Sequence, residues 1–146
     1  MSRRSKQRDT ILRIVMNSKD HPRADWIYEQ VRLEIPNISM GTIYRDLRSL
    51  AKAGEIRQLE IANGTSRFDG NTDSHYHFRC EGCSHIFDLN EPVDHSISER
   101  VAKNTGFKVY RQRMELIGLC NACQVNAHDN QCKNDIHPLG DELYQK

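Results

Sequence analysis

The first half of the chain shows three stretches in which apolar residues recur at helical spacing. These stretches cover residues 6–18, 24–35 and 39–51. The His21-Pro22 pair separates the first two, because proline restricts the residue before it and cannot continue a helix. Pro36 ends the second stretch, Ser39 is a suitable N-cap for the third, and Gly54 is a suitable residue after its end. The pattern therefore predicts three short helices.

Two strands are predicted directly after these helices. Residues 55–62 and 65–69 carry strand-like patterns, and Asn63-Gly64 between them is a hairpin turn signal. Three helices and a hairpin follow the order of a winged helix-turn-helix, in which the third helix lies in the major groove of DNA. The residues predicted to contact DNA are Ser39, Thr42, Tyr44, Arg45 and Arg48. The alternative is a helical bundle whose third helix has a solvated, charged face.

The second half predicts a mixed unit. Short strands are expected at 75–79 and 85–89, a helix at 92–105 that Gly106 ends, and a longer strand at 107–119. A unit this small buries little surface alone, so pairing with a second copy is expected. The predicted fold is α+β, with a winged-helix DNA-binding domain (1–70), a small polar hinge (71–74), an α/β dimerisation domain (75–126) and a polar tail (127–146).

The two halves of the chain differ in net charge. Residues 1–70 carry 13 Lys and Arg against 9 Asp and Glu, whereas the remainder carries 8 against 11. A basic first half fits an anionic partner such as DNA, although ordinary solvated surface charge explains the counts equally well. No apolar run approaches 18 residues and the polar N-terminus lacks a signal-peptide pattern, so a cytoplasmic protein with reduced cysteines is expected.

Two Cys-x2-Cys pairs predict a structural zinc site. Cys80 and Cys83 form one pair, and Cys120 and Cys123 form the other. Four thiolates satisfy a tetrahedral Zn²⁺ ion and leave no position open for catalysis. The alternative is two unrelated thiol pairs. Cys132 has no such partner and is interpreted as a free thiol in the tail.

A second group of potential metal ligands surrounds the predicted hinge. It consists of Asp69, His75, His77 and Asp88. His75 and His77 are two residues apart, so on a strand they point to the same face. Imidazole and carboxylate donors without thiolate suit Fe²⁺, Mn²⁺ or Zn²⁺. Spacing alone leaves open whether these are ligands or ordinary surface residues.

Taken together, the sequence resembles the ferric uptake regulator (Fur) superfamily of bacterial metal-dependent repressors. The motifs that carry the resemblance are Gln7-Arg8, His21-Pro22-x-Ala24-Asp25-x-Ile27-Tyr28, Asn37-x-Ser39-x-Gly41-Thr42-Ile43-Tyr44-Arg45-x-Leu47, Ser66-Arg67-Phe68-Asp69, His75-Tyr76-His77-x2-Cys80-x2-Cys83 and Cys120-x2-Cys123. Within it, the chain is similar to the peroxide-responsive branch (PerR). That resemblance implies a regulatory Fe²⁺ or Mn²⁺ site made of His21, Asp69, His75, His77 and Asp88.

The resemblance also implies how such a protein works. An ion held by both domains fixes their orientation, so that a homodimer fits a palindromic operator. Peroxide reacts at bound Fe²⁺, a ligand imidazole at His21 or His75 is oxidised, and repression is lifted. Mn²⁺ in the same site gives a repressor that does not respond to peroxide. Because the reaction consumes the sensor, the protein is not expected to be an enzyme.

Two alternatives remain open from the sequence. The assignment to the peroxide-responsive branch rests largely on Asp88, where iron sensors tend to carry Glu, so a repressor that senses iron or zinc availability is the first alternative. The second is a metallohydrolase that uses the His/Asp set. Such an enzyme needs an open coordination position, a base and a substrate pocket, and the sequence shows no base beside the set.

Overall fold

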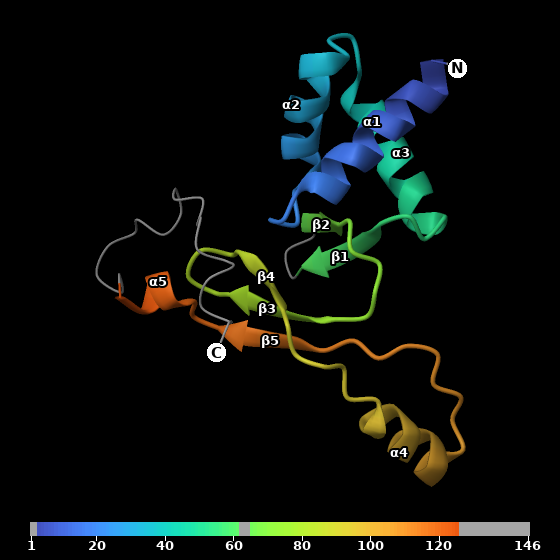
Figure 1. Cartoon of the computed structure of the whole chain (residues 1–146), viewed down its shortest axis with the longest axis vertical. Helices are drawn as coiled ribbons and strands as arrows, with labels where there is room; N and C mark the ends of the chain where they lie inside the picture. Colours follow the sequence, from blue (N-terminus) through green and yellow to red (C-terminus); the bar gives the residue numbers. More distant parts are fainter. Residues whose placement is uncertain (1–2, 62–64, 126–146) are drawn as a thin grey trace. The chain divides into compact units, whose positions relative to one another are not determined.

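The computed structural model describes residues 3–61 and 65–125 of the 146-residue chain, apart from the side chains of residues 3–5. The chain divides into two compact units, Met1–Asp73 and Ser74–Lys146. The division falls inside the predicted hinge at 71–74. Each unit is described by itself below (Figure 1).

Unit 1 begins with three helices packed around a shared apolar core. They are α1 (Arg3–Asn17), α2 (Ala24–Glu34) and α3 (Met40–Lys52). The predicted apolar positions face inward, because helical spacing places them on one stripe of each helix. The buried core consists of Ile11, Val15, Ala24, Ile27, Val31, Ile38, Ile43, Leu47, Leu50, Ile56 and Phe68. Fully burying one such aliphatic side chain contributes about 1.5–3 kcal/mol, so this cluster stabilises unit 1 without a metal.

The limits of α3 follow from its capping residues. The backbone N–H of Thr42 donates to Ser39 Oγ at 3.2 Å, which satisfies one of the helix's unpaired N–H groups. Gly54, just past the end, has φ of +75°, a left-handed conformation that a residue with a Cβ rarely adopts. Arg8 of α1 contacts Ser49 Oγ at 3.2 Å and Glu55 Oε1 at 2.5 Å. These contacts hold the end of α3 against α1.

The wing of unit 1 is a two-stranded antiparallel sheet. β1 (Arg57–Ile61) pairs with β2 (Thr65–Asp69), from Arg57 opposite Asp69 to Ile61 opposite Thr65. The predicted turn at Asn63-Gly64 lies outside the described residues. Three helices followed by this hairpin confirm the predicted winged helix.

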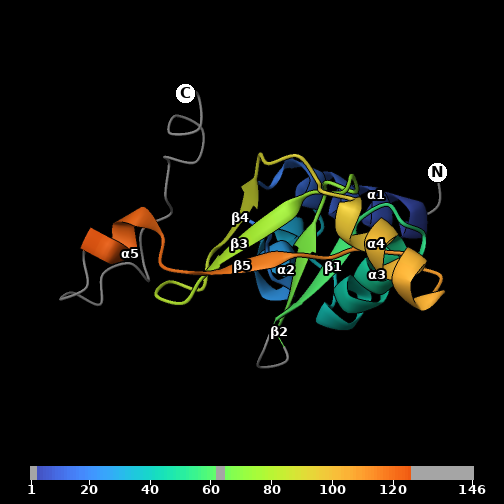
Figure 2. The same cartoon turned by 90° about the horizontal axis from the view of Figure 1, so that it is seen from below.

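Unit 2 contains a three-stranded mixed sheet with β3 in the centre (Figure 2). Its strands are β3 (Tyr76–Cys80), β4 (Ile86–Leu89) and β5 (Glu115–Gly118); β4 is antiparallel to β3 and β5 is parallel to it. The helices are α4 (Ser96–Thr105) and α5 (Asn121–Val125). Among the described residues of this unit, the buried apolar side chains are Tyr76, Cys80, Ile86 and Cys123. The predicted α+β class is confirmed.

Two predictions for unit 2 need correction, and one helix was not predicted. The predicted strand at 107–119 is wrong for most of its length, because β5 spans only Glu115–Gly118 and the preceding segment has no paired neighbour in the described chain. The predicted helix at 92–105 begins only at Ser96, where Asp94 Oδ1 accepts the Ser96 N–H at 2.9 Å. The short helix α5 was not predicted. The predicted polar tail at 127–146, with Cys132, lies outside the described residues.

Candidate functional site

The four predicted zinc ligands converge in unit 2. Their four Sγ atoms all lie within 4.8 Å of one another, and no disulfide joins them. The residues are Cys80, Cys83, Cys120 and Cys123. The Sγ atoms of Cys83 and Cys120 are 3.9 Å apart. A tetrahedral Zn²⁺ ion with Zn–S bonds of about 2.3 Å requires sulfur atoms about 3.8 Å apart. The donor set and its spacing therefore fit zinc.

Parallel pairing of β3 with β5 explains why the two cysteine pairs meet. Cys80 of β3 lies opposite Gly118 of β5. Cys120 is only two residues beyond Gly118, so it lies close to Cys80. The Cys120 N–H then donates to Cys80 Sγ at 3.3 Å. A Cβ on Gly82 would lie 2.8 Å from Cys123 Sγ, which leaves room for glycine alone in this turn. Backbone geometry thus assembles the cluster.

The thiols of the cluster differ in acidity. Burial opposes ionisation of Cys80, but hydrogen bonds from the backbone N–H groups of Cys120 and Cys83 and from neighbouring thiols outweigh it and lower the pKa of Cys80 to about 6. Burial raises the pKa of Cys83 to about 11. A bound metal ion would favour the thiolate form of these cysteines, since thiolate rather than thiol is the ligand.

Three of the predicted regulatory ligands form a cluster on one face of the unit 2 sheet. His77 on β3 lies directly opposite Asp88 on β4. Asp88 Oδ1 is 2.9 Å from His75 Nε2 and 3.3 Å from His77 Nε2, and the two imidazole rings are 4.4 Å apart. His77 is buried, whereas the Asp88 side chain is 45% exposed. We call these residues the sheet cluster.

The other two predicted regulatory ligands meet in unit 1. His21 Nε2 lies 3.7 Å from Asp69 Oδ2, and both side chains are buried. Asp69 ends β2, and its Oδ1 accepts the Asn71 N–H at 2.8 Å. His21 lies in the loop between α1 and α2 with φ of +46°, an uncommon conformation for a residue other than glycine. We call this the wing pair.

Both groups present the donor chemistry of a first-row transition metal site. Imidazole nitrogen and carboxylate oxygen without thiolate suit Fe²⁺, Mn²⁺ or Zn²⁺. The burial of His21 and Asp69 strengthens the case, because a buried carboxylate beside an imidazole is costly unless a cation or hydrogen bonds stabilise it. The residues present therefore fit a divalent metal.

The third helix of unit 1 presents a basic groove. The groove has a volume of about 380 Å³ and is lined by Gly41, Tyr44, Arg45, Arg48, Ser49 and Lys52. Three cationic side chains on one exposed helix face suit nucleic-acid phosphates. Lys52 was not among the residues predicted to contact DNA, although it continues the helical spacing of Arg45 and Arg48.

Two of the predicted DNA-contacting residues have a structural role as well. Ser39 Oγ accepts the Thr42 N–H and lies 2.9 Å from Thr42 Oγ1. Both hydroxyls therefore contribute to the start of α3, and neither lines the basic groove. The predicted contacts Tyr44, Arg45 and Arg48 do line it. No helix in the described part of the chain has the length and apolar character to cross a membrane.

Comparisons with known proteins agree on one family. The model of the ferric uptake regulator family matches residues 2–117. The chain is 42% identical over 118 residues to the peroxide-responsive repressor PerR of Staphylococcus aureus (strain USA300), covering 81% of this chain and 80% of that protein.

Two solved structures are similar over most of the chain. The ferric uptake regulator Fur of Helicobacter pylori has a TM-score of 0.71 and 26% identity, over 82% of this chain and 80% of that one. The peroxide stress regulator of Campylobacter jejuni has a TM-score of 0.69 and 25% identity, over 82% of this chain and 90% of that one.

Proposed function

Because the chain belongs to the ferric uptake regulator family, we propose that it is a metal-dependent, DNA-binding repressor that responds to hydrogen peroxide. The observation that carries the proposal is the division of the His/Asp donors into two groups. His21 and Asp69 approach each other in unit 1, whereas His75 and His77 surround Asp88 in unit 2. Only five residues separate Asp69 from His75 in the chain.

The cysteine cluster serves as the structural zinc site. Unit 2 buries few apolar side chains among its described residues, so its core alone stabilises it weakly. Cys80 is the last residue of β3 and Cys83 follows it, whereas Cys120 and Cys123 follow β5, so one ion bound to all four holds these ends together. Zinc binding then contributes directly to the folding of this unit.

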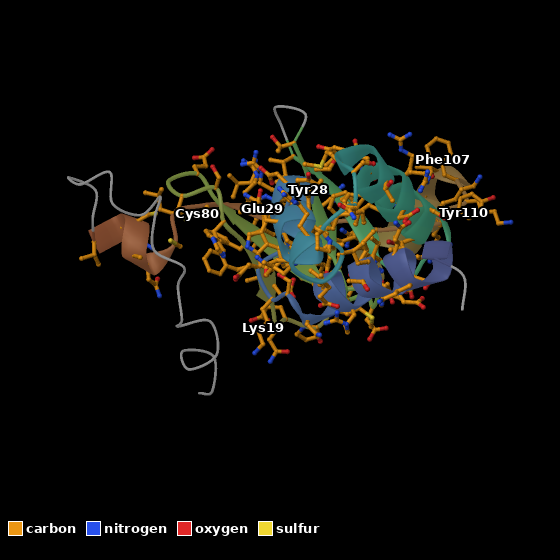
Figure 3. The ribbon with its side chains drawn as sticks, turned by 90° about the horizontal axis from the view of Figure 1, so that it is seen from above. Lys19, Tyr28, Glu29, Cys80, Phe107 and Tyr110 are labelled. Carbon is orange, nitrogen blue, oxygen red and sulfur yellow. The ribbon has the colours of Figure 1, made fainter. Side chains whose placement is uncertain are left out.

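The protein acts as a homodimer through unit 2. Helix α4 buries none of its residues, and apolar side chains on α4, β5 and the segment between them are exposed. They are Ile97, Val101, Phe107, Val109, Tyr110, Leu116 and Ile117; Phe107 and Tyr110 are labelled in Figure 3. We call this set the apolar face. In the dimer, a second copy of the chain covers these exposed apolar side chains.

One regulatory ion is shared between the wing pair and the sheet cluster. His21 and Asp69 would bind it from unit 1, and His75, His77 and Asp88 from unit 2. Binding both groups at once selects one orientation of the units about residues 71–74. In a dimer, that orientation sets the spacing of the two α3 helices, which must match successive major grooves of a palindromic operator.

The histidines of this site are also its sensors. Bound Fe²⁺ would promote cleavage of the O–O bond of hydrogen peroxide, whereas Mn²⁺ would bind without that reactivity. One peroxide oxygen would be inserted into a ring C–H bond of His21 or His75, which is thereby oxidised by two electrons, and the other would leave as water. The oxidised ring would be a poorer ligand. The two units then lose their shared ion, and the dimer releases DNA. The sensor is consumed, so no catalytic turnover is part of this function.

A DNA-binding experiment with different metals tests the proposal. The zinc-loaded protein, supplied with Mn²⁺ or with Fe²⁺ without oxygen, is expected to retard a palindromic duplex in a gel, and a chelator is expected to abolish the shift. Peroxide should release the Fe²⁺ form only. If peroxide releases neither form and binding follows only the concentration of free metal, the protein senses metal availability instead.

A further inference from the structure

The backbone at His21 has a positive φ, which is uncommon for a residue other than glycine. Its φ of +46° brings the Cβ close to neighbouring backbone atoms, which is unfavourable for every residue except glycine. Such a conformation persists only where the surrounding structure enforces it. Something in unit 1 must therefore fix the loop that presents this imidazole to Asp69.

Strand β2 provides this support. The Phe68 N–H donates to the Pro22 carbonyl oxygen at 3.0 Å, and Arg23 forms an antiparallel bridge with Arg67. Since Arg67 also lies opposite Leu59 of β1, residues 21–23 lie along the other edge of β2. The loop thus extends the wing sheet by a short third segment.

The Arg67 side chain completes the attachment at His21 itself. Its Nη1 donates to the His21 carbonyl oxygen at 3.4 Å. The Arg67 side chain is partly buried, and burial followed by the Arg23 charge lowers its pKa. A cation beside a metal ligand also opposes metal binding by Coulomb repulsion. Two costs therefore accompany Arg67; the negative charge of Asp25 and the hydrogen bond to His21 both act against them.

Asp69 is fixed by a separate bond of the same unit. Its Oδ1 accepts the Asn71 N–H at 2.8 Å, so Oδ2 is the oxygen that faces His21 Nε2. Both donors of the wing pair are therefore positioned by bonds within unit 1. Preorganised ligands lose less conformational freedom when they bind, which raises affinity.

We propose that Arg67 is a positioning residue that fixes the backbone of His21 and so pre-forms the wing pair before a metal ion binds. The inference rests on the proposed function, because it assumes that the wing pair binds metal. It predicts that the Arg67 contact increases metal affinity, despite the repulsive charge. A residue that acted only through its charge would have the opposite effect.

The test is a titration of the full-length, zinc-loaded protein with Mn²⁺, in which the electron paramagnetic resonance signal reports free ion. Arg67→Met keeps the apolar stem and removes the donor, and it should weaken Mn²⁺ binding by about tenfold or more, the scale of lost outer-shell contacts. Arg67→Lys keeps a cationic N–H donor group and should restore affinity to within about threefold. Arg23→Ala removes an exposed neighbouring charge and is the matched control.

Two results would overturn the inference. One is Mn²⁺ binding by Arg67→Met that equals or exceeds the wild type. The other is equal weakening by Arg67→Met and Arg67→Lys, which indicates that packing, rather than the donated hydrogen bond, matters. The His21→Ala variant distinguishes failure of the Arg67 inference from failure of the proposed function. If His21→Ala leaves Mn²⁺ affinity unchanged, the regulatory site itself is wrong; if it weakens binding and Arg67→Met does not, only the role of Arg67 fails.

Discussion

The Nε2 atom of His21 lies 3.7 Å from Oδ2 of Asp69, and both side chains are buried in unit 1. The two residues are 48 positions apart, and strand β2 brings the second one to the loop that carries the first. An imidazole and a carboxylate placed together in this way are donors that suit a divalent cation. The proposed regulation depends on this pair.

Removing one ligand of the wing pair should prevent Mn²⁺ from promoting DNA binding. His21→Ala and Asp69→Asn each remove a donor, so we expect Mn²⁺ affinity to fall by at least about tenfold, comparable to or greater than the loss of an outer-shell contact. The zinc content should stay at the wild-type level. Gel retardation at increasing Mn²⁺ concentrations measures the effect.

His85→Ala is the matched control, because His85 lies in unit 2 beside the Phe87 ring and outside both donor groups. The shared-ion model would be wrong if His21→Ala still retarded DNA at wild-type Mn²⁺ concentrations.

Breaking the cysteine cluster should abolish zinc binding and destabilise unit 2. Cys80→Ser removes one of the four thiolates, and we expect zinc to fall from about one ion per chain to almost none. Loss of the ion removes the link between the ends of β3 and β5. Zinc release measured with a colorimetric chelator, together with thermal unfolding, checks this. Cys132→Ser should keep its zinc; a zinc-replete Cys80→Ser protein would contradict the assignment.

A charge on the apolar face should separate the dimer. Ile117 of β5 is 52% exposed, so Ile117→Asp leaves the carboxylate in water in the monomer but buries it in the dimer. We expect dimerisation to weaken by about 30-fold or more, as for loss of a central interface residue. Sedimentation velocity measures the change. Leu33→Asp alters an apolar residue of unit 1 that is 78% exposed, and it should leave the dimer intact.

Lys52 should contact DNA phosphate. It lines the basic groove with Arg45 and Arg48, at the end of α3. Lys52→Ala should weaken binding similarly for all sequences and reduce the slope of log affinity against log salt by about one for each lost contact. Arg45→Ala should also alter sequence preference if it reaches a base edge. Lys103→Ala, on α4 of unit 2, is the control for charge; a wild-type salt slope in Lys52→Ala would exclude a phosphate contact.

Most of unit 1 could be predicted because its signals are local. Ser39 caps α3 and Gly54 follows it in the left-handed conformation, as their residue types indicate. Both Cys-x2-Cys pairs were visible, because the spacing itself defines a zinc site. His21 was identified only by resemblance, since no periodic pattern marks a buried histidine in a loop with positive φ.

The two failures in unit 2 have different physical reasons. Residues 107–119 alternate enough to predict a strand, but a strand requires a neighbour, and only Glu115–Gly118 has one in the described chain. Helix α5 has five residues, too few for a periodic signal. The support of His21 by Arg67 depends on pairing across the sheet, which sequence spacing does not show.

Whether ligand histidines sense peroxide can be tested by a peptide mass map. The protein is loaded with Fe²⁺ without oxygen, bound to its palindromic duplex and treated with a small excess of hydrogen peroxide, with a Mn²⁺-loaded sample in parallel. We expect the peptide of His21 or His75 to gain one oxygen atom as DNA is released, in the Fe²⁺ sample only. Release of DNA without any oxidised histidine would contradict the account.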